Sequence, residues 1–340
     1  MRAARLYGAR DLRVEDLSEP RLGPRQVLLQ VRAVTLCGSD VHYYRLGALG
    51  DTPIREPLIL GHEFTADIVA VGDEVKGLHP GQRVAVDPAQ FCGSCEWCRE
   101  GHPNLCPAVR FCGSPPYDGA LRQYLAYPSE TIFPLPESMD YCTGALLEPL
   151  GIGLHAMGLA KLRLADTVAV LGCGPIGLIL IQLARISGAS VVYAVDPLAY
   201  RCEVAERLGA VPVKVSEAVD YILRDTKGRG VDLVLEATTD TQAAWQAIDL
   251  VRRGGKVVLV GIPDEDTLSF PASLMRRKGV SLLISRRMKH TYERAMALVE
   301  RGLVDLSYLA THRFPLEDTK AAFELASRYE DRVLRAAVEF

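Results

Sequence analysis

A glycine-rich loop between a predicted strand and a predicted helix is the feature that most constrains the fold of this chain. The loop, 172-GCGPIG-177, follows the apolar run Thr167–Leu171 and opens the helical run Pro175–Ser187. Gly172 suits a tight turn, Gly174 lets the backbone approach a pyrophosphate, and Gly177 lets helix and strand pack closely. The helix N-terminus favours phosphates. The motif therefore predicts a dinucleotide site at Gly172, Gly174, Pro175, Ile176 and Gly177.

An acidic residue after the next strand refines this prediction. Asp196 closes the run Val191–Val195, about 20 residues beyond the glycine loop. A carboxylate there accepts hydrogen bonds from the ribose 2′-OH and repels a 2′-phosphate, so NAD is favoured over NADP. Arg201 is near enough in the sequence to weaken that preference. The alternative is a plain glycine turn in another α/β protein.

The two halves of the chain differ in their patterns. From Asp166 onward, apolar strands alternate with helical runs, which is typical of βαβ units and a parallel sheet. The expected strands after the first two are Val231–Leu235 and Lys256–Val260, and the expected helices are Tyr200–Leu208, Ala218–Thr226, Thr241–Val251 and Thr291–Arg301. The first 140 or so residues are instead short β-runs cut by glycine and proline, such as Gln26–Val34 and Arg83–Val86, and they predict a barrel-like β unit.

Length and charge exclude several classes of function. A chain of 340 residues favours about two domains. The net charge of −3, with no run of like charges, argues against nucleic acid or a membrane surface as the main partner. No uncharged stretch reaches the roughly 18 apolar residues of a spanning helix, and the start lacks the apolar core of a signal peptide. We therefore expect a cytoplasmic protein.

Four cysteines lie within the single segment 91-FCGSCEWCREGHPNLC-106. Their spacing, C-x₂-C-x₂-C-x₇-C, is typical of a zinc site in a reducing compartment. Four thiolates leave no position for water or substrate, so they predict a closed, structural zinc. The ligands are Cys92, Cys95, Cys98 and Cys106.

A second, scattered set of metal-ligand residues consists of Cys37 in 37-CGSD-40 and of His62 and Glu63 in 61-GHE-63. Three protein ligands and one open position describe a catalytic zinc. Taken alone, these residue types are equally compatible with ordinary packing and surface positions.

The order of these motifs resembles that of the zinc-containing medium-chain alcohol dehydrogenases. The segments are CGSDVHYY, GHE, the four-cysteine loop and GCGPIG with its distal aspartate, and the resemblance extends to 311-THRFPLE-317. Within that superfamily, 111-FCGSPPYDGA-120 and 147-LEPLGIGLHA-156 resemble the polyol branch of sorbitol and xylitol dehydrogenases. Two departures are Ala66, where glycine is usual, and Met288, where sorbitol dehydrogenases often have an aromatic residue.

The resemblance implies an α/β fold with two domains. A GroES-like β-rich catalytic domain would comprise residues 1–150 and 286–340, and a Rossmann NAD-binding domain residues 151–285. The implied reaction transfers a hydride from a secondary alcohol of a polyol, such as sorbitol, xylitol or galactitol, to NAD and gives a ketose. The implied assembly is a homotetramer.

The resemblance also implies roles for individual residues. Cys37, His62 and Glu63 surround the catalytic zinc, and Glu148 replaces a second cysteine ligand and binds directly or through water. Asp40 orients His62. Ser39 and His42 match the proton-relay positions. The substrate is contacted by Tyr43, Glu148 and Arg287, and the nicotinamide by Val260 and Ile262.

Other functions remain open at this stage. Threonine and 2,3-butanediol dehydrogenases are the nearest rivals. A phosphorylated sugar alcohol is a further rival, because Arg286 and Lys289 flank Arg287. From another class, a dinucleotide-binding protein without catalysis is possible, although it would not require the metal and relay residues.

Overall fold

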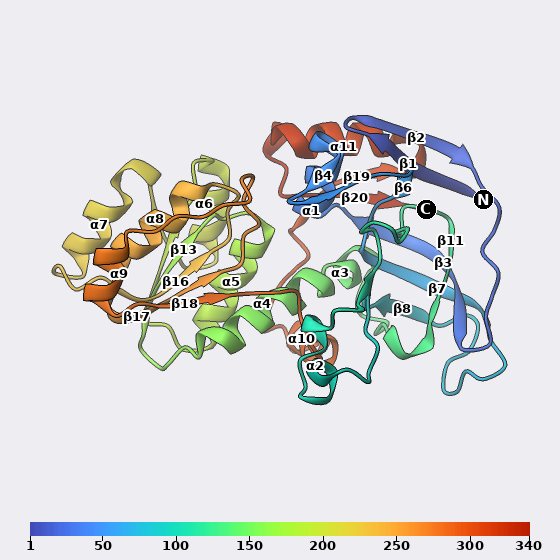
Figure 1. Cartoon of the computed structure of the whole chain (residues 1–340), viewed down its shortest axis with the longest axis horizontal. Helices are drawn as coiled ribbons and strands as arrows, with labels where there is room; N and C mark the ends of the chain where they lie inside the picture. Colours follow the sequence, from blue (N-terminus) through green and yellow to red (C-terminus); the bar gives the residue numbers. More distant parts are fainter. The chain divides into compact units, whose positions relative to one another are not determined.

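The first unit of the structure is built around a mixed sheet of seven strands. The computed structural model describes residues 1–340 and divides into one unit of Met1–Glu148 with Tyr292–Phe340 and another of Pro149–Thr291 (Figure 1). Along the sheet the order is β12-β8-β7-β3-β20-β19, and β11 also pairs with β3. These strands are β3 (Gln26–Thr35), β7 (Glu63–Val71), β8 (Arg83–Val86), β11 (Tyr124–Pro128), β12 (Ile132–Pro134), β19 (Ala310–Pro315) and β20 (Arg335–Glu339).

Alternating burial explains why β3 lies at the centre. Val27, Leu29 and Val31 are fully buried, and the residues between them are only partly covered. This is the period of two that the sequence predicts for a half-buried strand. The late strands β19 and β20, red in Figure 1, extend the sheet, with β20 antiparallel to β3.

Short strands and helices complete the first unit. The small sheets are made by β1 (Arg2–Gly8), β2 (Asp11–Asp16), β4 (Ala48–Leu49), β5 (Thr52–Pro53), β6 (Leu58–Ile59), β9 (Ala89–Gln90) and β10 (Arg110–Phe111). The helices are α1 (Gly38–Leu46), α2 (Glu96–Arg99), α3 (Tyr141–Ala145), α10 (Tyr292–Glu300) and α11 (Thr319–Arg328), and α4 (Leu147–Ala160) continues into the second unit. No helix in the structure has the length and apolar character needed to span a membrane.

The second unit is a parallel sheet of six strands in the order β15-β14-β13-β16-β17-β18. Its strands are β13 (Thr167–Leu171), β14 (Val191–Val195), β15 (Val211–Val213), β16 (Val231–Glu236), β17 (Val251–Leu259) and β18 (Ser281–Ile284). This is the strand order of a Rossmann fold. Ligands bind beyond the carboxyl ends of such strands, where the order reverses between β13 and β16.

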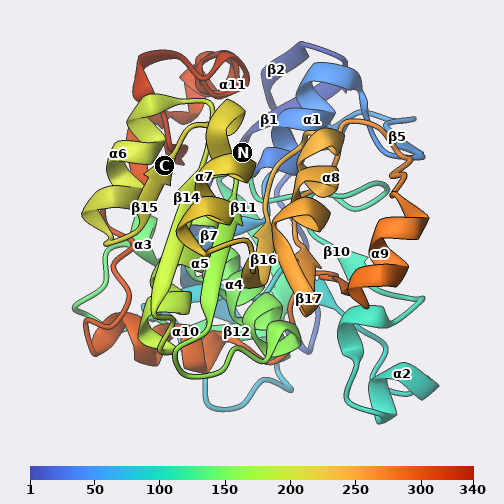
Figure 2. The same cartoon turned by 90° about the vertical axis from the view of Figure 1, so that its left-hand side faces the viewer.

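Helices cover both faces of this sheet. They are α5 (Pro175–Ile186), α6 (Ala199–Arg207), α7 (Ala218–Asp225), α8 (Thr241–Leu250) and α9 (Ala272–Lys278). Figure 2 shows α7 and α8 in front of the strands, and their apolar residues join a core with Ala169 and Leu171. Val170, which points the other way, lies against the first turn of α5.

Two details of the second unit differ from the sequence-based expectation. Strand β17 begins at Val251, not at Lys256, because Val251 already pairs with Val231 and the register shifts before Lys256 pairs with Leu233. Gly254, at φ +66°, lies between Val251 and Lys256, where the register shifts. The short elements β15, α9 and β18 carried no clear sequence pattern and were not predicted.

Candidate active site and metal centres

The start of α1 presents Cys37 together with a buried carboxylate. Cys37 is the N-cap of α1, and the Asp40 carboxylate accepts hydrogen bonds from the backbone N–H of Cys37 at 3.0 Å and of Gly61 at 3.2 Å. An acidic side chain in the first helical turn also complements the helix dipole. Asp40 thereby fastens the 61-GHE-63 segment to the start of α1.

His62 is held between this carboxylate and an aromatic ring. Its Nδ1 lies 3.4 Å from Asp40 Oδ1, and its ring centroid lies 5.2 Å from that of Phe111. Gly61, at φ +93°, leaves no room for a Cβ, which would lie 2.8 Å from Val34. The backbone before His62 therefore requires glycine.

The ligand atoms of Cys37, His62 and Glu63 all lie within 4.8 Å of one another. Glu63 is fully buried, and both of its oxygens already have protein partners. Oε2 accepts a hydrogen bond from Thr35 Oγ1, and Oε1 lies 3.0 Å from Arg335 Nη2. The Glu63 carboxylate is thus charge-compensated inside the protein.

The electrostatics of this cluster suit a bound cation. Burial lowers the pKa of His62, but Asp40 and Cys37 outweigh burial and raise that pKa well above its usual range. Burial raises the pKa of the Glu148 carboxyl to about 8. The shift of His62 favours a positive charge in the cluster, and that of Glu148 favours a neutral carboxyl. A Zn²⁺ ion would supply that charge to a thiolate, an imidazole and carboxylates, which are all zinc ligands.

Glu148 lies near this cluster without joining its tightest group. It sits in the first turn of α4, is 3% exposed, and interacts electrostatically with His62 and Glu63. The three ligand atoms that fall within 4.8 Å of one another do not include a Glu148 oxygen. Of the four predicted ligands, the structure therefore gathers three closely and leaves the fourth beside them.

The residues matched to the proton relay share helix α1. His42 and Tyr43 are buried, whereas Ser39 is partly exposed. The Tyr43 hydroxyl lies 3.5 Å from Ser114 Oγ. Arg287 belongs to the second unit, where it adopts φ +53°.

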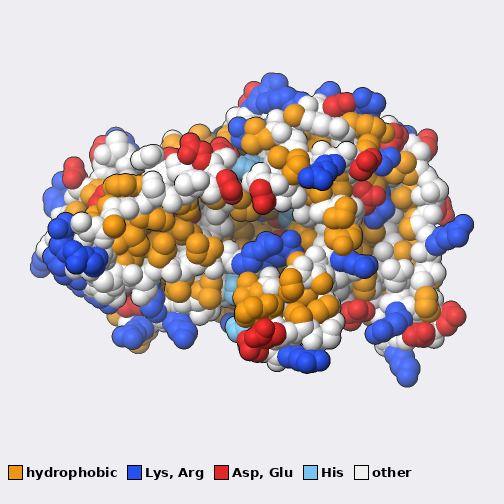
Figure 3. Space-filling view, viewed as in Figure 1, with side chains coloured by type: hydrophobic (Ala, Val, Ile, Leu, Met, Phe, Trp, Pro, Cys, Tyr) orange, Lys and Arg blue, Asp and Glu red, His pale blue; other side chains and the backbone are white.

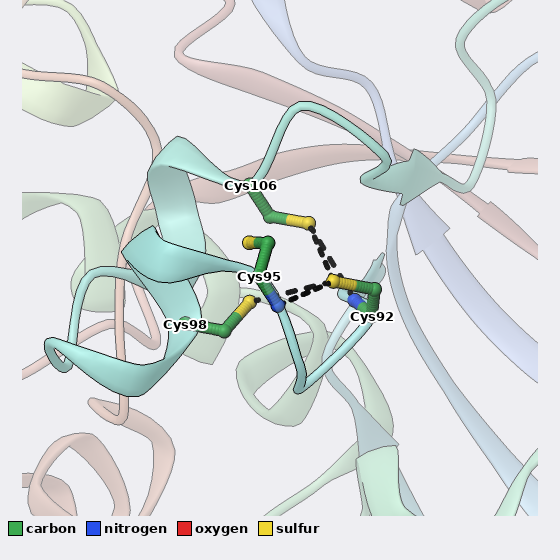
Figure 4. A group of neighbouring side chains, drawn as sticks. All are labelled: Cys92, Cys95, Cys98 and Cys106. Carbon is green, nitrogen blue, oxygen red and sulfur yellow. Dashed lines mark hydrogen bonds between the residues drawn. The ribbon is translucent and has the colours of Figure 1, made fainter.

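The four-cysteine loop closes on itself (Figure 4). The Cys92 sulfur lies 3.6 Å from that of Cys106 and 4.0 Å from that of Cys98. A tetrahedral site with Zn–S bonds of ~2.3 Å requires sulfurs roughly 3.8 Å apart. Backbone hydrogen bonds from Ser94 and Cys95 lower the pKa of the Cys92 thiol to about 6, which favours the thiolate. The loop fits a structural zinc.

The glycine loop of the second unit has the close contacts that its motif predicts. A Cβ on Gly177 would lie 1.8 Å from the carbonyl oxygen of Gly172. Gly172 itself adopts φ +87°. Gly174 is the N-cap of α5, and a Cβ there would meet only Arg201, at 3.7 Å. The space next to Gly174 is where a pyrophosphate would lie.

Asp196 binds this loop from the end of β14. Its Oδ2 accepts a hydrogen bond from Cys173 N at 2.7 Å, and its Oδ1 accepts one from Leu198 N at 2.8 Å. Arg201 Nη1 lies 3.6 Å from Oδ2. Asp196 therefore holds the glycine loop to the end of β14.

Val260 and Ile262 follow the carboxyl end of β17. The backbone N–H of Val260 donates to Glu236 O at 2.8 Å, which ties this segment to the end of β16. Ile262 is 47% exposed. Both residues thus lie at the strand ends that bind cofactor in Rossmann folds.

A parallel Rossmann sheet, a Cys–His–carboxylate cluster and a closed four-cysteine loop together define a zinc-dependent nucleotide-binding dehydrogenase. Comparison with known families agrees. Residues 23–137 match the alcohol dehydrogenase GroES-like domain, and residues 175–301 match the zinc-binding dehydrogenase family. The chain belongs to the zinc-containing medium-chain alcohol dehydrogenase superfamily, in its polyol branch. It is an oxidoreductase whose cofactors are zinc and a nicotinamide dinucleotide.

Three relatives illustrate the similarity. The chain is 36% identical to a sorbitol dehydrogenase of Bacillus subtilis, over 99% of this chain and 97% of that protein. An oxidoreductase of unknown specificity from Escherichia coli is 31% identical, with a TM-score of 0.93 and coverage of 99% and 98%. Galactitol-1-phosphate dehydrogenase from Escherichia coli is 28% identical, with a TM-score of 0.90 over 100% of both chains.

Thr35 and Arg335 were not among the residues predicted for the site. Both bind Glu63, and Arg335 also donates to Leu36 O at 2.8 Å. One sequence signal was available for Arg335, since an arginine within the apolar run RVLRAAVEF is unusual in a buried strand unless it is paired. Thr35 offered no comparable signal.

Proposed function

We propose that the protein is an NAD-dependent polyol dehydrogenase that oxidises a secondary hydroxyl of an unphosphorylated sugar alcohol to a ketone. The observation that carries the proposal is the group of Cys37, His62 and Glu63, with ligand atoms within 4.8 Å. It occurs in a chain that is similar to a sorbitol dehydrogenase over almost its whole length. The class of substrate is sorbitol, xylitol or galactitol.

In this proposal Cys37 and His62 hold the zinc, and Glu63 and Glu148 complete its surroundings. Zinc supplies a Lewis acid, and NAD supplies the hydride acceptor. A histidine alone would face a proton transfer roughly 13 kcal/mol uphill from an alcohol of pKa ~16. The residues that hold the metal therefore contribute more to the rate than any single base.

The remaining residues orient groups and move the proton. Asp40 fixes the ring of His62 through the contact at 3.4 Å. Ser39 and His42, on the same helix, pass the hydroxyl proton outward. Tyr43 and Arg287 contact further hydroxyls of the substrate.

On the cofactor, Asp196 accepts a hydrogen bond from the ribose and disfavours a 2′-phosphate, which makes NAD the better substrate. Arg201, 3.6 Å from Asp196, reduces the preference for NAD over NADP without reversing it. Gly172, Gly174, Pro175, Ile176 and Gly177 hold the pyrophosphate, and Val260 and Ile262 flank the nicotinamide.

A sugar-alcohol phosphate is the second candidate. The observation in its favour is the cationic run Arg286, Arg287 and Lys289, and one structural neighbour acts on galactitol 1-phosphate by its name. Burial lowers the pKa of Arg286, and a bound phosphate would offset that burial.

The test is the initial rate of NADH formation with zinc present on sorbitol, xylitol, galactitol, threonine, 2,3-butanediol and a sugar-alcohol phosphate. A preference for free polyols supports the proposal. A preference for the phosphate, for threonine or for butanediol would contradict the proposed substrate class but not the dehydrogenase activity. Absence of turnover on the whole panel, with NADH still bound, would favour a non-catalytic protein. Sedimentation in the same buffer tests the homotetramer.

A further inference from the structure

A cavity of about 330 Å³ opens in the first unit beside strand β11. None of the residues proposed to hold zinc lines it. Its polar lining comes from Gln26, Gln90, Arg110, Tyr117, Asp118, Arg122 and Tyr127. A volume of this size lies at the small end of ligand pockets, so it suits a small metabolite and is too small for a dinucleotide.

Arg122 is the unusual member of this lining. Its Nε is buried without a hydrogen-bond partner, although the residue as a whole is only partly buried, and its guanidinium forms no ion pair within the chain. Burial lowers the pKa of Arg122 even though Asp118 lies near enough to raise it. A cation with a buried nitrogen is stabilised by a charge partner, and such a charge is normally paired.

The other charges around the cavity do not supply that partner. Asp118 Oδ1 accepts a hydrogen bond from Ile59 N at 3.0 Å. Arg110 adds a second cation, whose only recorded contact is with the ring of Tyr117, at 5.7 Å from its centroid. The cavity therefore has two guanidinium groups without an ion pair, of which that of Arg110 is exposed to solvent, and one carboxylate that already binds the backbone.

In a second basic hollow of the molecule, the cations have partners within the chain. It lies in the second unit, at the end where Lys and Arg side chains gather at the left of Figure 3. There Arg229 and Arg252 both bind Asp232 at 2.6 Å. Lys278 donates to three backbone carbonyls, at 2.7–2.8 Å. That hollow needs no ligand, whereas the chain itself supplies no ion-pair partner for Arg122.

We propose that the cavity beside β11 binds a small oxyanion, a phosphate- or carboxylate-bearing metabolite, between Arg110 and Arg122. A guanidinium group binds such anions with two parallel charge-assisted hydrogen bonds, which would satisfy Arg122. The Gln90 amide, also in the lining, offers a further donor. The site is separate from the proposed zinc and dinucleotide sites and does not depend on the substrate of the enzyme.

The cavity wall is bonded to the segment that leads to His62. Between the lining residues Asp118 and Arg122, the backbone N–H groups of Ala120 and Leu121 donate to Gly61 O at 2.8 Å and to Leu60 O at 3.0 Å. Phe111, part of the wall, packs against the His62 ring. An anion in the cavity would therefore bind next to the structure that supports the metal cluster, without touching it.

The experiment measures anion binding to the zinc-loaded protein by calorimetry and thermal shift. Saturating NADH is present throughout, so that phosphate cannot report on the glycine loop. The probes are inorganic phosphate and citrate, with chloride at equal ionic strength as the control. The variants are Arg122→Gln, Arg110→Gln and, as a matched control, Arg207→Gln, which removes one exposed and unpaired arginine from α6.

The proposal expects saturable binding of phosphate or citrate and none of chloride. Arg122→Gln should raise the Kd roughly ten- to a hundredfold, the effect of losing a charge-assisted bidentate contact. Arg110→Gln should raise it less, and Arg207→Gln should not change it. Without anion, Arg122→Gln should not lower the melting temperature, because the change removes a cation that forms no ion pair in the chain.

Three results would overturn the proposal. The first is no saturable binding to the wild-type protein. The second is equal binding by wild type and both cavity variants. The third is a change in oligomeric state on Arg122→Gln while wild type binds no free anion, which would identify a carboxylate of a second copy as the partner. If Arg122→Gln does not fold, the Kd of Arg110→Gln decides.

Discussion

Arg335 Nη2 lies 3.0 Å from Glu63 Oε1, and the two side chains are 5% and 0% exposed. Strand pairing brings them together from distant parts of the sequence, because Thr35 of β3 pairs with Glu63 on one side and with Ala337 of β20 on the other. The charge of Glu63 is thereby compensated before any metal binds. A zinc ion would therefore bind to a cluster in which Arg335 already balances the charge of one carboxylate.

Replacing Arg335 by methionine should leave Glu63 buried without a counter-charge. We expect a loss of roughly 3–5 kcal/mol in the free energy of unfolding, the usual cost of breaking a buried ion pair. Urea denaturation checks this. The matched control is Arg313→Met on β19, whose pair with Glu339 is about half exposed and should cost at most about 1 kcal/mol. Equal effects of the two variants would contradict the role given to Arg335.

Asp40→Asn should weaken zinc binding while leaving α1 folded. The carboxylate orients His62 and binds the backbone of Cys37 and Gly61. Loss of a carboxylate that orients a ligand histidine typically reduces metal affinity about 10–100-fold. Competition with a chromophoric chelator measures this directly. Asp51→Asn, whose only side-chain contact is with Thr52, is the control, and zinc affinity equal to that of wild type in Asp40→Asn would refute the assignment.

The two cysteine groups should respond differently to substitution. Cys95→Ala should release one zinc per chain and lower the melting temperature by roughly 5–10 °C, because a structural zinc stabilises the fold directly. Cys37→Ala should abolish turnover with the melting temperature little changed. Metal analysis, calorimetry and NADH formation on the same samples separate the two cases. Normal turnover by Cys37→Ala would remove this residue from the zinc site.

The glycine loop offers a matched pair of substitutions. Gly177→Ala places a Cβ 1.8 Å from Gly172 O and should destabilise the protein by about 2 kcal/mol or more through overpacking. Gly174→Ala meets nothing nearer than 3.7 Å. It should fold normally and weaken NADH binding, because the methyl group occupies the space for the pyrophosphate. Unfolding curves and NADH fluorescence titration test both variants. Unaltered NADH affinity in Gly174→Ala would contradict the placement of the pyrophosphate next to Gly174.

Asp232 should make the second unit sensitive to acid. Burial raises its pKa, but hydrogen bonds from Arg229, Thr167 and Arg252 outweigh burial and hold that pKa well below its usual range. A lowered folded-state pKa contributes stability above the unfolded value of about 4 and loses it as pH falls further. At pH 7 we expect Asp232→Asn to be about 1–2 kcal/mol less stable than wild type.

That difference should shrink as pH falls below about 5 and vanish once wild-type Asp232 is protonated. Urea unfolding of both proteins between pH 3 and 7 gives the difference in unfolding free energy directly. Any loss of zinc in acid affects both proteins equally and does not contribute to that difference. Asp266→Asn, an exposed aspartate in the same unit, should differ from wild type by a constant amount. If the difference in unfolding free energy between Asp232→Asn and wild type were also constant, the charge of the Asp232 carboxylate would not be what stabilises its contacts with Arg229 and Arg252.

Local spacing was sufficient to predict the two motifs that are continuous in the sequence. Cys92, Cys95, Cys98 and Cys106 lie within one loop, and 172-GCGPIG-177 lies within one strand–helix turn, so chain geometry alone brings their members together. Cys37 and His62 needed the family resemblance, because they lie on separate segments that come together only in the folded chain. Arg335 reaches Glu63 only through the β3–β20 pairing, and such long-range pairing leaves no local pattern.

The first unit is assembled from two stretches of chain that flank the whole second unit. Chains grow at about 5–20 residues per second, so on the order of 15–60 s separate the synthesis of Glu63 from that of Arg335. The four-cysteine loop, by contrast, is finished within about one to three seconds of its first cysteine. The topology therefore separates two events of biosynthesis: the four-cysteine loop is complete while most of the chain is still to be made, and Glu63 gains its counter-charge only with the last strand.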